Sequence, residues 1–239
     1  MDQPRADKRA FLVRARRIRG PFSHNPSSDS LHHVMAIRLP PFSIAILAGG
    51  KSRRMKGKDK LSVELAGKPV LSHVLERLEP LRKRAAETFL VAKKKEKLER
   101  YGIRVALDAN ETDGPIIGII AALKAASTTH TLIVGGDLPF ASPEIGELLL
   151  ERCGVYDLTI PLMGSMYEPL FAVYSKACIE VFEYGFDEGT KKIIDLFPGL
   201  SVNRVPQNDW RPYDPNDIAF LNINTPEDLA KAEEIIRKQ

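Results

Sequence analysis

Apolar and polar positions follow a regular pattern from Phe42 to the end of the chain. Short apolar runs, which are typical of buried strands, alternate with stretches whose apolar residues recur at helical spacing. We expect strands at residues 42–47, 88–92, 103–108, 131–136, 157–162, 170–175, 201–205 and 219–224. We expect helices at residues 69–83, 93–101, 116–127, 142–152, 175–184 and 225–238.

This alternation predicts one doubly wound α/β domain, in which helices cover both faces of a mostly parallel sheet. The strands expected after Asp157 follow one another closely, which favours a small antiparallel part in the C-terminal half. The last helix has clear start signals, because Thr225 can serve as N-cap, Pro226 occupies the first helical position and Asp228 lies in the first turn.

The first 40 residues lack this pattern and are rich in Arg, Ser, Pro and Asn. We expect residues 1–40 to be a disordered basic extension and residues 41–239 to form a single domain. The extension carries eight Lys and Arg residues and three Asp residues, a net charge of +5, whereas the whole chain carries +4. The domain therefore carries the difference, −1, so the basic pI does not indicate nucleic-acid binding. For the extension, an overlong start before Met35 and an Arg-rich transit peptide both remain open.

Composition excludes several classes of protein. Apolar residues make up 44% of the chain and charged residues 28%, as is typical of a soluble globular protein. No apolar run in the sequence approaches the roughly 20 residues of a membrane span. Cys153 and Cys178 show neither a metal-site spacing nor a disulfide framework, and the five histidines are scattered. We therefore expect a cytoplasmic protein with no membrane association, no nucleic-acid partner and no histidine metal site.

The stretch LAGGKSRRMKGKDK at residues 47–60 follows the first expected strand and indicates a phosphate-binding loop. Gly49 and Gly50 would allow backbone N–H groups to approach an anion. A triphosphatase P-loop needs a glycine where Ala45 stands, and adjacent glycines do not match the dinucleotide fingerprint, so we exclude both motifs. An open triphosphate-binding loop and a solvated basic turn remain. The cations that could neutralise a triphosphate are Lys51, Arg53, Arg54, Lys56, Lys58 and Lys60.

Acidic residues end two of the expected strands, at Asp108 and Asp137. Ligands of open α/β sheets bind at the carboxyl ends of the strands, and a carboxylate beside a triphosphate commonly holds Mg²⁺. We therefore expect Mg²⁺ at Asp137, although a turn or cap role remains open for both acids. Asn222 and Asn224 lie two apart on the last expected strand and would face the same side, towards either a neighbouring turn or a ligand.

Several short motifs occur in a set order along the chain. They are LAGG at 47–50, RM at 54–55, DK at 59–60, GKP at 67–69, GPxxG at 114–118, GGDLP at 135–139, EPLFAVY at 168–174 and NINTPEDL at 222–229. Together they resemble the molybdenum cofactor guanylyltransferase family, the MobA type, over nearly all of residues 42–239.

The resemblance implies a Rossmann-like nucleotidyltransferase fold and an Mg²⁺-dependent transferase of molybdenum cofactor biosynthesis. Such an enzyme transfers GMP from GTP to the terminal phosphate of molybdopterin and releases pyrophosphate. GTP and Mo-molybdopterin would be the substrates, and Mg²⁺ would be the cofactor. Molybdoenzymes or cofactor-insertion chaperones would be the expected protein contacts, and the enzyme would be a monomer or a weak homo-oligomer.

The chemistry of nucleotidyl transfer gives a hypothesis for the catalytic residues, which are Arg54, Lys60 and Asp137. Arg54 and Lys60, with Gly49 and Gly50, would clamp the β- and γ-phosphates, and Asp137 would hold Mg²⁺. The resemblance also implies ligand-binding residues. The implied ligand contacts are Leu47, Ala48, Gly49 and Gly50 at the nucleotide, Lys60 at its phosphates, Asp108 at the guanosine, Asp137 at Mg²⁺, and Asn222 and Asn224 at the pterin.

The chain departs from the family pattern at positions that bear on the site. Gly136 stands where the family usually has Cys or another small residue, which should be tolerated because that side chain is not needed for the metal. The asparagine that often ends the second strand and contacts the base has no clear counterpart, since the chain offers Ala92 or Lys93. The alternatives are a related nucleotidyltransferase that uses CTP or another acceptor phosphate, and a non-catalytic nucleotide-binding protein that delivers the cofactor.

Two further residues have two interpretations each. Glu168, with Pro169, is either part of a surface turn or a lip of the acceptor pocket. Trp210 either stacks on the pterin or packs against the edge of the sheet.

Overall fold

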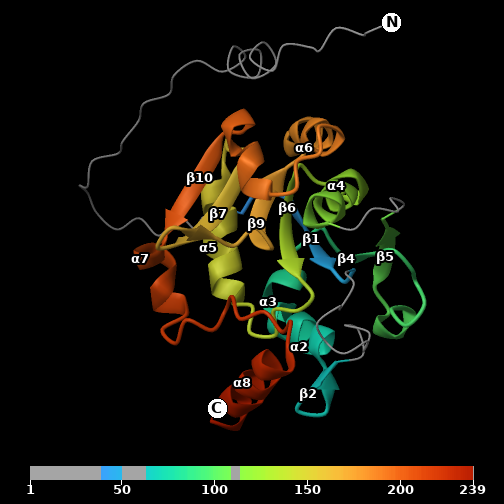
Figure 1. Ribbon diagram of the computed structural model, residues 1–239, viewed down its shortest axis with the longest axis vertical. Coiled ribbons are helices and arrows are strands. Elements are labelled where there is room, and N and C mark those ends of the chain that lie inside the picture. The colour runs from blue at the N-terminus through green and yellow to red at the C-terminus, as the bar shows by residue number, and fades with distance from the viewer. Residues whose placement is uncertain (1–38, 50–62, 109–113, 239) are drawn as a thin grey trace, which may run out of the picture.

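The computed structural model describes residues 39–49, 63–108 and 114–238 (Figure 1). Most of its strands belong to one central sheet, and two short strands form a separate antiparallel pair. The strands are β1 (Phe42–Leu47), β2 (Glu64–Leu65), β3 (Lys68–Pro69), β4 (Glu87–Ala92), β5 (Arg104–Leu107), β6 (His130–Gly135), β7 (Leu158–Met163), β8 (Met166–Tyr167), β9 (Phe171–Ser175) and β10 (Val202–Pro206).

The central sheet has eight strands in the order β10-β7-β9-β6-β1-β4-β5, with β8 paired to β7 outside this path. β1 runs parallel to its neighbours β4 and β6, and β4 runs parallel to β5. β9 runs antiparallel to both β6 and β7, and β10 runs parallel to β7. The predicted sheet, mostly parallel with an antiparallel part in the C-terminal half, is therefore confirmed.

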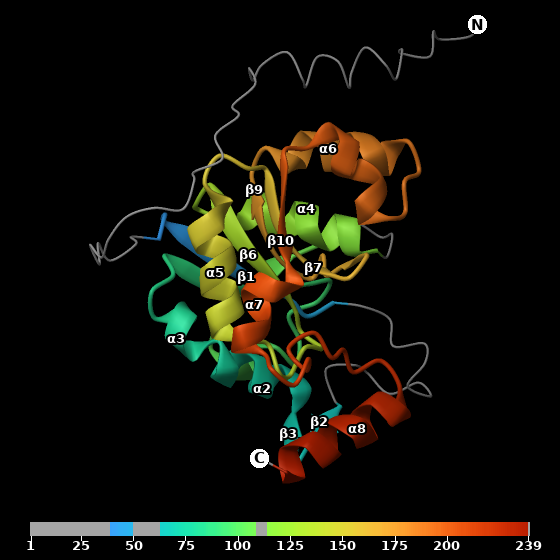
Figure 2. The same ribbon diagram turned by 90° about the vertical axis from the view of Figure 1, so that its left-hand side faces the viewer.

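Helices cover both faces of the sheet (Figure 2). In the described part of the chain, every helix is too short or too polar to cross a bilayer. The α-helices are α2 (Val70–Arg77), α3 (Glu79–Arg82), α4 (Pro115–Ala125), α5 (Pro143–Cys153), α6 (Cys178–Asp187), α7 (Gln207–Trp210) and α8 (Pro226–Arg237), and the 3₁₀ helices are η2 (Glu99–Tyr101), η3 (Ile193–Gly199) and η4 (Arg211–Tyr213).

The side chains of β1 alternate between two hydrophobic cores. Ile44 and Ile46 join the core that also holds most of the buried residues of α2, α3 and α5, whereas Ala45 joins the core under α4 and α6. All three side chains are fully buried. A strand that is buried on both faces needs a nearly continuous apolar run, and this need explains the sequence FSIAIL, in which Ser43 is the one polar residue.

The last helix, α8, begins as predicted. The Thr225 hydroxyl accepts a hydrogen bond from the backbone N–H of Asp228 at 3.2 Å, and the Asp228 carboxylate accepts one from the backbone N–H of Thr225 at 2.9 Å. This reciprocal capping box satisfies backbone donors that the first turn of a helix leaves unpaired. Ala232 of α8 is buried in a third, smaller core with residues of β2.

Two of the predicted helices are wrong in part. The helix expected at 69–83 is divided at Leu78, because Pro80 cannot donate a backbone hydrogen bond and would clash with the preceding turn. Of the helix expected at 93–101, only the 3₁₀ turn η2 is present. Residues 93–97 are all exposed, so no apolar face holds a helix there against the sheet.

The strand predicted at 219–224 is also wrong, because the structure has no strand there. This segment crosses outside the carboxyl end of β6, where the backbone N–H of Ile223 donates to the carbonyl oxygen of Asp137 at 2.9 Å. The segment makes this contact without forming a ladder with the sheet.

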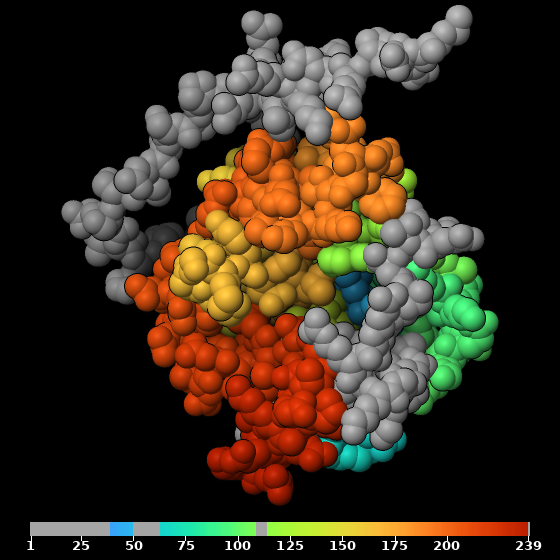
Figure 3. Space-filling model, viewed as in Figure 1, coloured from blue at the N-terminus to red at the C-terminus, as the bar shows by residue number. Residues whose placement is uncertain are grey.

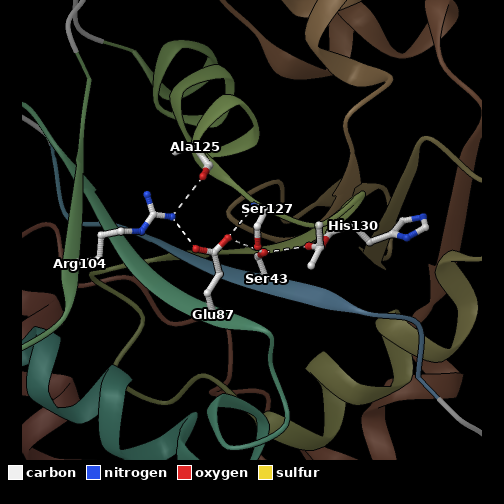
Figure 4. A network of polar contacts seen from close by, with 7 residues as sticks. Ser43, Glu87, Arg104, Ala125, Ser127 and His130 are labelled. Carbon is white, nitrogen blue, oxygen red and sulfur yellow. Dashed lines mark hydrogen bonds and ion pairs between the residues drawn. The ribbon is translucent and has the colours of Figure 1, made fainter.

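A polar network joins the amino ends of β1, β4 and β5 (Figure 4). The Glu87 carboxylate accepts hydrogen bonds from the Ser43 hydroxyl at 3.1 Å, from the Ser127 backbone N–H at 2.6 Å and from the Arg104 guanidinium at 2.7 Å. Arg104 also donates to the carbonyl oxygen of Ala125 at 3.2 Å. Burial by itself would raise the pKa of Glu87, but these hydrogen bonds outweigh burial and hold the pKa below its usual value.

Glu87→Gln should destabilise the protein in a pH-dependent way. Because the pKa of Glu87 is lower in the folded state, the ionised carboxylate stabilises the fold above the unfolded pKa, and this contribution is lost as the pH falls through the folded pKa. At pH 7 the substitution should lower the free energy of unfolding by about 1–3 kcal/mol, and the difference should shrink below about pH 4. Urea unfolding of both proteins across this pH range measures the difference at pH 7 and its decrease at low pH.

Glu151→Gln is the matched control for this experiment, because Glu151 is an exposed acid on α5. It should change the free energy of unfolding little at any pH. A loss of stability in Glu87→Gln that stays constant from pH 3 to pH 8 would contradict the assigned role of the carboxylate charge.

Candidate functional site

A cavity of about 430 Å³ lies at the carboxyl ends of β1, β4 and β6. In the space-filling view, blue atoms of the β1 segment are visible in a hollow of this face (Figure 3). Open α/β sheets bind ligands at this edge, and small-molecule sites commonly have volumes of about 300–1,000 Å³. The lining residues are Leu47, Gly49, Val91, Ala92, Lys93, Asp108, Gly114, Pro115, Gly118, Gly135, Asp137, Leu170, Asn222 and Asn224.

Two glycines at the end of β6 allow the backbone to approach closely here. The backbone N–H of Gly136 donates to the carbonyl oxygen of Leu47 at 3.0 Å, and a Cβ at this glycine would lie 3.0 Å from the same oxygen. A Cβ on Gly135 would lie 2.7 Å from Oδ1 of Asp137. The glycine pair therefore leaves room both for the carbonyl group at the end of β1 and for the carboxylate.

Asp137 is a nearly buried carboxylate, with 8% of its surface exposed, directly after β6. Its carbonyl oxygen accepts the hydrogen bond from Ile223, whose side chain is buried in the small core under α8. Asn222 and Asn224, on either side of Ile223 in the sequence, both line the cavity.

The amino end of α4 borders the cavity. Gly114 precedes the helix, Pro115 is its first residue and Gly118 lies one turn further on, and all three line the cavity. The first turn of a helix has unpaired backbone N–H groups and a partial positive charge, which favour a bound anion. The glycines keep this surface free of side chains.

Glu168 is held beside the cavity by contacts of both its main chain and its side chain. Its Oε1 accepts a hydrogen bond from the backbone N–H of Leu170 at 3.1 Å. Burial and the negative charge of Asp137 raise the pKa of Glu168 to about 7, although the hydrogen bond from Leu170 and the polar side chain of Asn222 oppose the increase.

The structure brings together most of the described residues that the resemblance implied. Ala48 is an exception: its backbone N–H donates to Val91 O at 2.9 Å, and its side chain is not part of the lining. Gly50, Arg54 and Lys60 lie outside the described residues. The predicted residues that do line the cavity are Leu47, Gly49, Asp108, Asp137, Asn222 and Asn224.

Other lining residues were less evident from the sequence. Ala92 and Lys93, the two candidates for the position of the missing asparagine, both line the cavity. Leu170 also lines the cavity and was not predicted as a site residue. Trp210 packs in the core, with its ring 5.0 Å from that of Phe220, so the packing interpretation is correct.

The donor groups at this edge suit a hard cation. In the described segments, no group of three or more His, Cys, Asp or Glu side chains is placed to hold a metal ion. Mg²⁺ does not require such a group, because it commonly binds one or two carboxylates and completes its shell with water and phosphate oxygens. The carboxylate of Asp137 and the amide oxygens of Asn222 and Asn224 are oxygen ligands of the kind that Mg²⁺ prefers.

The doubly wound sheet and the cavity at its carboxyl edge define an α/β protein of the class that binds ligands at this edge. A family model, the MobA-like NTP transferase domain, matches residues 44–201, and the chain belongs to this family. The protein is thus a nucleotidyltransferase of Rossmann-like fold. The family resemblance and the fold class predicted from the sequence are both confirmed.

Similar proteins carry consistent names. One from Pelotomaculum thermopropionicum, named probable molybdenum cofactor guanylyltransferase, is 38% identical over 187 residues, which cover 78% of this chain and 89% of that protein. One of the same name from Methanosarcina mazei is 35% identical, with 78% and 88% covered. The crystal structure of molybdopterin-guanine dinucleotide biosynthesis protein A from Archaeoglobus fulgidus has a TM-score of 0.71 and 34% identity, and covers 82% of this chain and 100% of that chain.

Glu168→Gln should change how stability depends on pH when Mg²⁺ and nucleotide are absent. The pKa of Glu168 is raised in the folded state, so ionisation of this carboxyl costs stability as the pH rises from about 4.5 to about 7. Glutamine does not ionise. The free energy of unfolding of the variant, minus that of the wild type, should therefore increase by about 2 kcal/mol from pH 5 to pH 8. Urea unfolding at pH 5 and at pH 8 tests this. If the difference between the two proteins stayed constant or fell from pH 5 to pH 8, the prediction would be contradicted.

Proposed function

We propose that this protein transfers GMP from GTP to the terminal phosphate of molybdopterin and releases pyrophosphate. The names of the similar proteins support these substrates. The observation that carries the proposal is the cavity at the carboxyl edge of the sheet, because a single space adjoins the end of β1, the amino end of α4, the carboxylate of Asp137 and the paired Asn222 and Asn224.

Mg²⁺ is the proposed cofactor, and Asp137 is its proposed protein ligand. When bound, Mg²⁺ would neutralise charge on the phosphates of the nucleotide. The position of Asp137 supports this role, because its carboxylate is nearly buried and lies beside the residues proposed to bind the nucleotide.

The proposed nucleotide site lies between β1 and α4. Leu47 and Gly49 would contact the nucleotide, and the amino end of α4 would attract its phosphates. Asp108, which follows β5, would contact the guanosine. Arg54 and Lys60 lie outside the described residues, and we propose them as phosphate ligands because of their positions in the cation-rich stretch after β1.

The proposed reaction needs alignment and charge stabilisation more than proton transfer. An oxygen of the acceptor phosphate attacks the α-phosphorus, the bond between this phosphorus and the bridging oxygen breaks, and its electron pair leaves on pyrophosphate. A phosphate monoester is already largely ionised at neutral pH, so no general base is required. The chain would hold the two phosphates in line and stabilise the leaving pyrophosphate.

The asparagines would face the acceptor. Asn222 and Asn224 come from the C-terminal segment of the chain and line one part of the cavity. We propose that the pterin binds there. The experiments that follow distinguish the proposed enzyme from two alternatives. One is a related enzyme that uses CTP or another acceptor phosphate, and the other is a delivery protein that binds nucleotide without turnover.

GTP with Mg²⁺ should raise the thermal midpoint of unfolding, whereas CTP, ATP and UTP should have little effect. A ligand at a hundred times its dissociation constant stabilises the folded state by about 2.7 kcal/mol. Asp137→Asn should remove the dependence on Mg²⁺, and Asp195→Asn, at an exposed acid on η3, should not. A larger shift with CTP would keep the reaction class but overturn GTP as the donor.

Lys60→Ala should lower the rate of GMP transfer by about a hundredfold or more, because one cation would no longer stabilise the leaving pyrophosphate. Transfer is measured as GTP- and molybdopterin-dependent release of pyrophosphate. Lys94→Ala, at an exposed lysine that does not line the cavity, serves as the matched control. Nearly full activity in Lys60→Ala, with an unchanged thermal midpoint, would refute the role of Lys60 in phosphate binding.

A further inference from the structure

β5 is the last strand at one edge of the central sheet, and it lies at the outside of the molecule (Figure 1). In the described part of the chain, β4 is the only strand that pairs with it. A hollow of about 980 Å³ adjoins β5, lined by Arg104, Ala106, Leu107 and Asp108 together with residues of α4 and α6. Leu107 has 51% of its surface exposed. An accessible strand edge of this kind can pair with a strand of another chain.

The backbone of β5 presents two residues to this open edge. In a parallel ladder, alternate residues direct both their N–H and their carbonyl group to the same neighbouring strand. The backbone N–H of Asp108 donates to Ala92 O at 2.9 Å, so Asp108 and Ala106 direct their backbone groups to β4. The backbone groups of Val105 and Leu107 therefore point away from β4, towards the open edge.

The two ends of β5 carry opposite charges. Arg104 begins the strand, and Asp108 follows its last residue. Alternate residues of a strand share one face of the sheet, and the guanidinium of Arg104 lies 4.3 Å from the ring centroid of Phe89, in the core under α4. Arg104 and Asp108 therefore lie on the α4 side. After its contacts within the chain, the side chain of Arg104 still has 47% of its surface exposed.

We propose that the open edge of β5 binds the same edge of a second copy of this chain, antiparallel and around a twofold axis at Ala106. In this register Val105 lies opposite Leu107 of the partner subunit, and these two residues exchange both of their backbone hydrogen bonds. Arg104 lies opposite Asp108 of the partner subunit on the α4 side. The twofold axis repeats both contacts, so the two sheets continue into one.

The charges at the ends of β5 favour a second copy as the partner and fix the register. Antiparallel pairing with the same strand sets opposite charges against each other at both ends, whereas parallel pairing would set like charges side by side. A register shifted by two residues would move Arg104 away from Asp108 of the partner subunit. Few residues make the contact, so the dimer should be weak and depend on protein concentration.

The proposed contact also reaches the candidate site. Asp108 lines both the hollow beside β5 and the cavity at the carboxyl ends of the strands. In the dimer, Arg104 of the partner subunit would therefore stand at the rim of that cavity. The inference does not rest on the proposed function, because the open backbone groups and the charges of β5 carry it.

Sedimentation velocity over a series of protein concentrations tests the charges. The wild type should form dimers as the concentration rises. Asp108→Lys would set two cations against each other at both ends of the strand pair, and should raise the dissociation constant of the dimer about tenfold. Asp195→Lys, the same charge change at an exposed acid on η3, should leave this constant unchanged.

Two results of this experiment would overturn the inference. One is a wild type that stays monomeric at every concentration up to about 1 mM, which would leave the edge to a different protein. The other is a dimer that Asp108→Lys does not weaken, which would place the interface elsewhere. Mixing Asp108→Lys with Arg104→Glu should restore association, because each pair in the mixed dimer again has opposite charges.

A cysteine on the twofold axis tests the register. Ala106 would lie opposite Ala106 of the partner subunit in a non-hydrogen-bonded pair, with Cα atoms about 4.5 Å apart, within the range of a disulfide. Ala106→Cys should therefore give a disulfide-linked dimer when oxidised glutathione is added. Leu107→Cys is the matched control. It is the more exposed position, but its two copies would lie about 7–8 Å apart. Cys153 and Cys178 are both buried.

The cross-linking result decides the register without any assay of transfer, so it stands whether or not the proposed function holds. No linked dimer with Ala106→Cys, or an equal yield with Leu107→Cys, would contradict the proposed pairing. Thermal midpoints show first that each variant folds. If Arg104→Glu does not fold, because it also loses the bond to Glu87, the cysteine variants and Asp108→Lys still decide the question.

Discussion

The candidate site depends on the hydrogen bonds that gather three separate segments around the end of β6. Parallel strands end at the same edge of a sheet, but their loops remain independent unless something connects them. Here backbone N–H groups and carbonyl oxygens make the connections, so the cavity does not rely on a particular set of long side chains. The pairs are Gly136 N to Leu47 O, Gly135 N to Leu170 O, and Ile223 N to Asp137 O.

The two ends of the sheet use carboxylates in opposite ways. At the amino ends, Glu87 accepts several hydrogen bonds and its pKa falls, so its charge stabilises the fold at neutral pH. At the carboxyl ends, burial and the charge of Asp137 raise the pKa of Glu168, so its charge costs stability. A carboxylate kept at such a cost is typical of a site that binds ligands, whereas the network around Glu87 serves the fold.

Local sequence patterns were sufficient for most of the fold. Apolar runs marked the strands of the sheet, because strands buried on both faces need them, and the capping residues marked the start of α8 at Thr225. The helices and the strand that were predicted wrongly have other local causes. Pro80 divided a helix, the exposed residues at 93–97 had no apolar face to form one, and residues 219–224 begin in a turn and pair with no strand.

For the site, residue order indicated the chemistry but not the contacts. The glycine-rich stretch after β1, the acids at strand ends and the pair Asn222 and Asn224 could be identified because motif spacing records which residues occur near strand ends. The hydrogen bond from the backbone of Ile223 to that of Asp137 could not be predicted, since it joins two segments far apart in sequence. Only the folded chain decides such a pair, because the packing of each segment against β6 determines which groups meet.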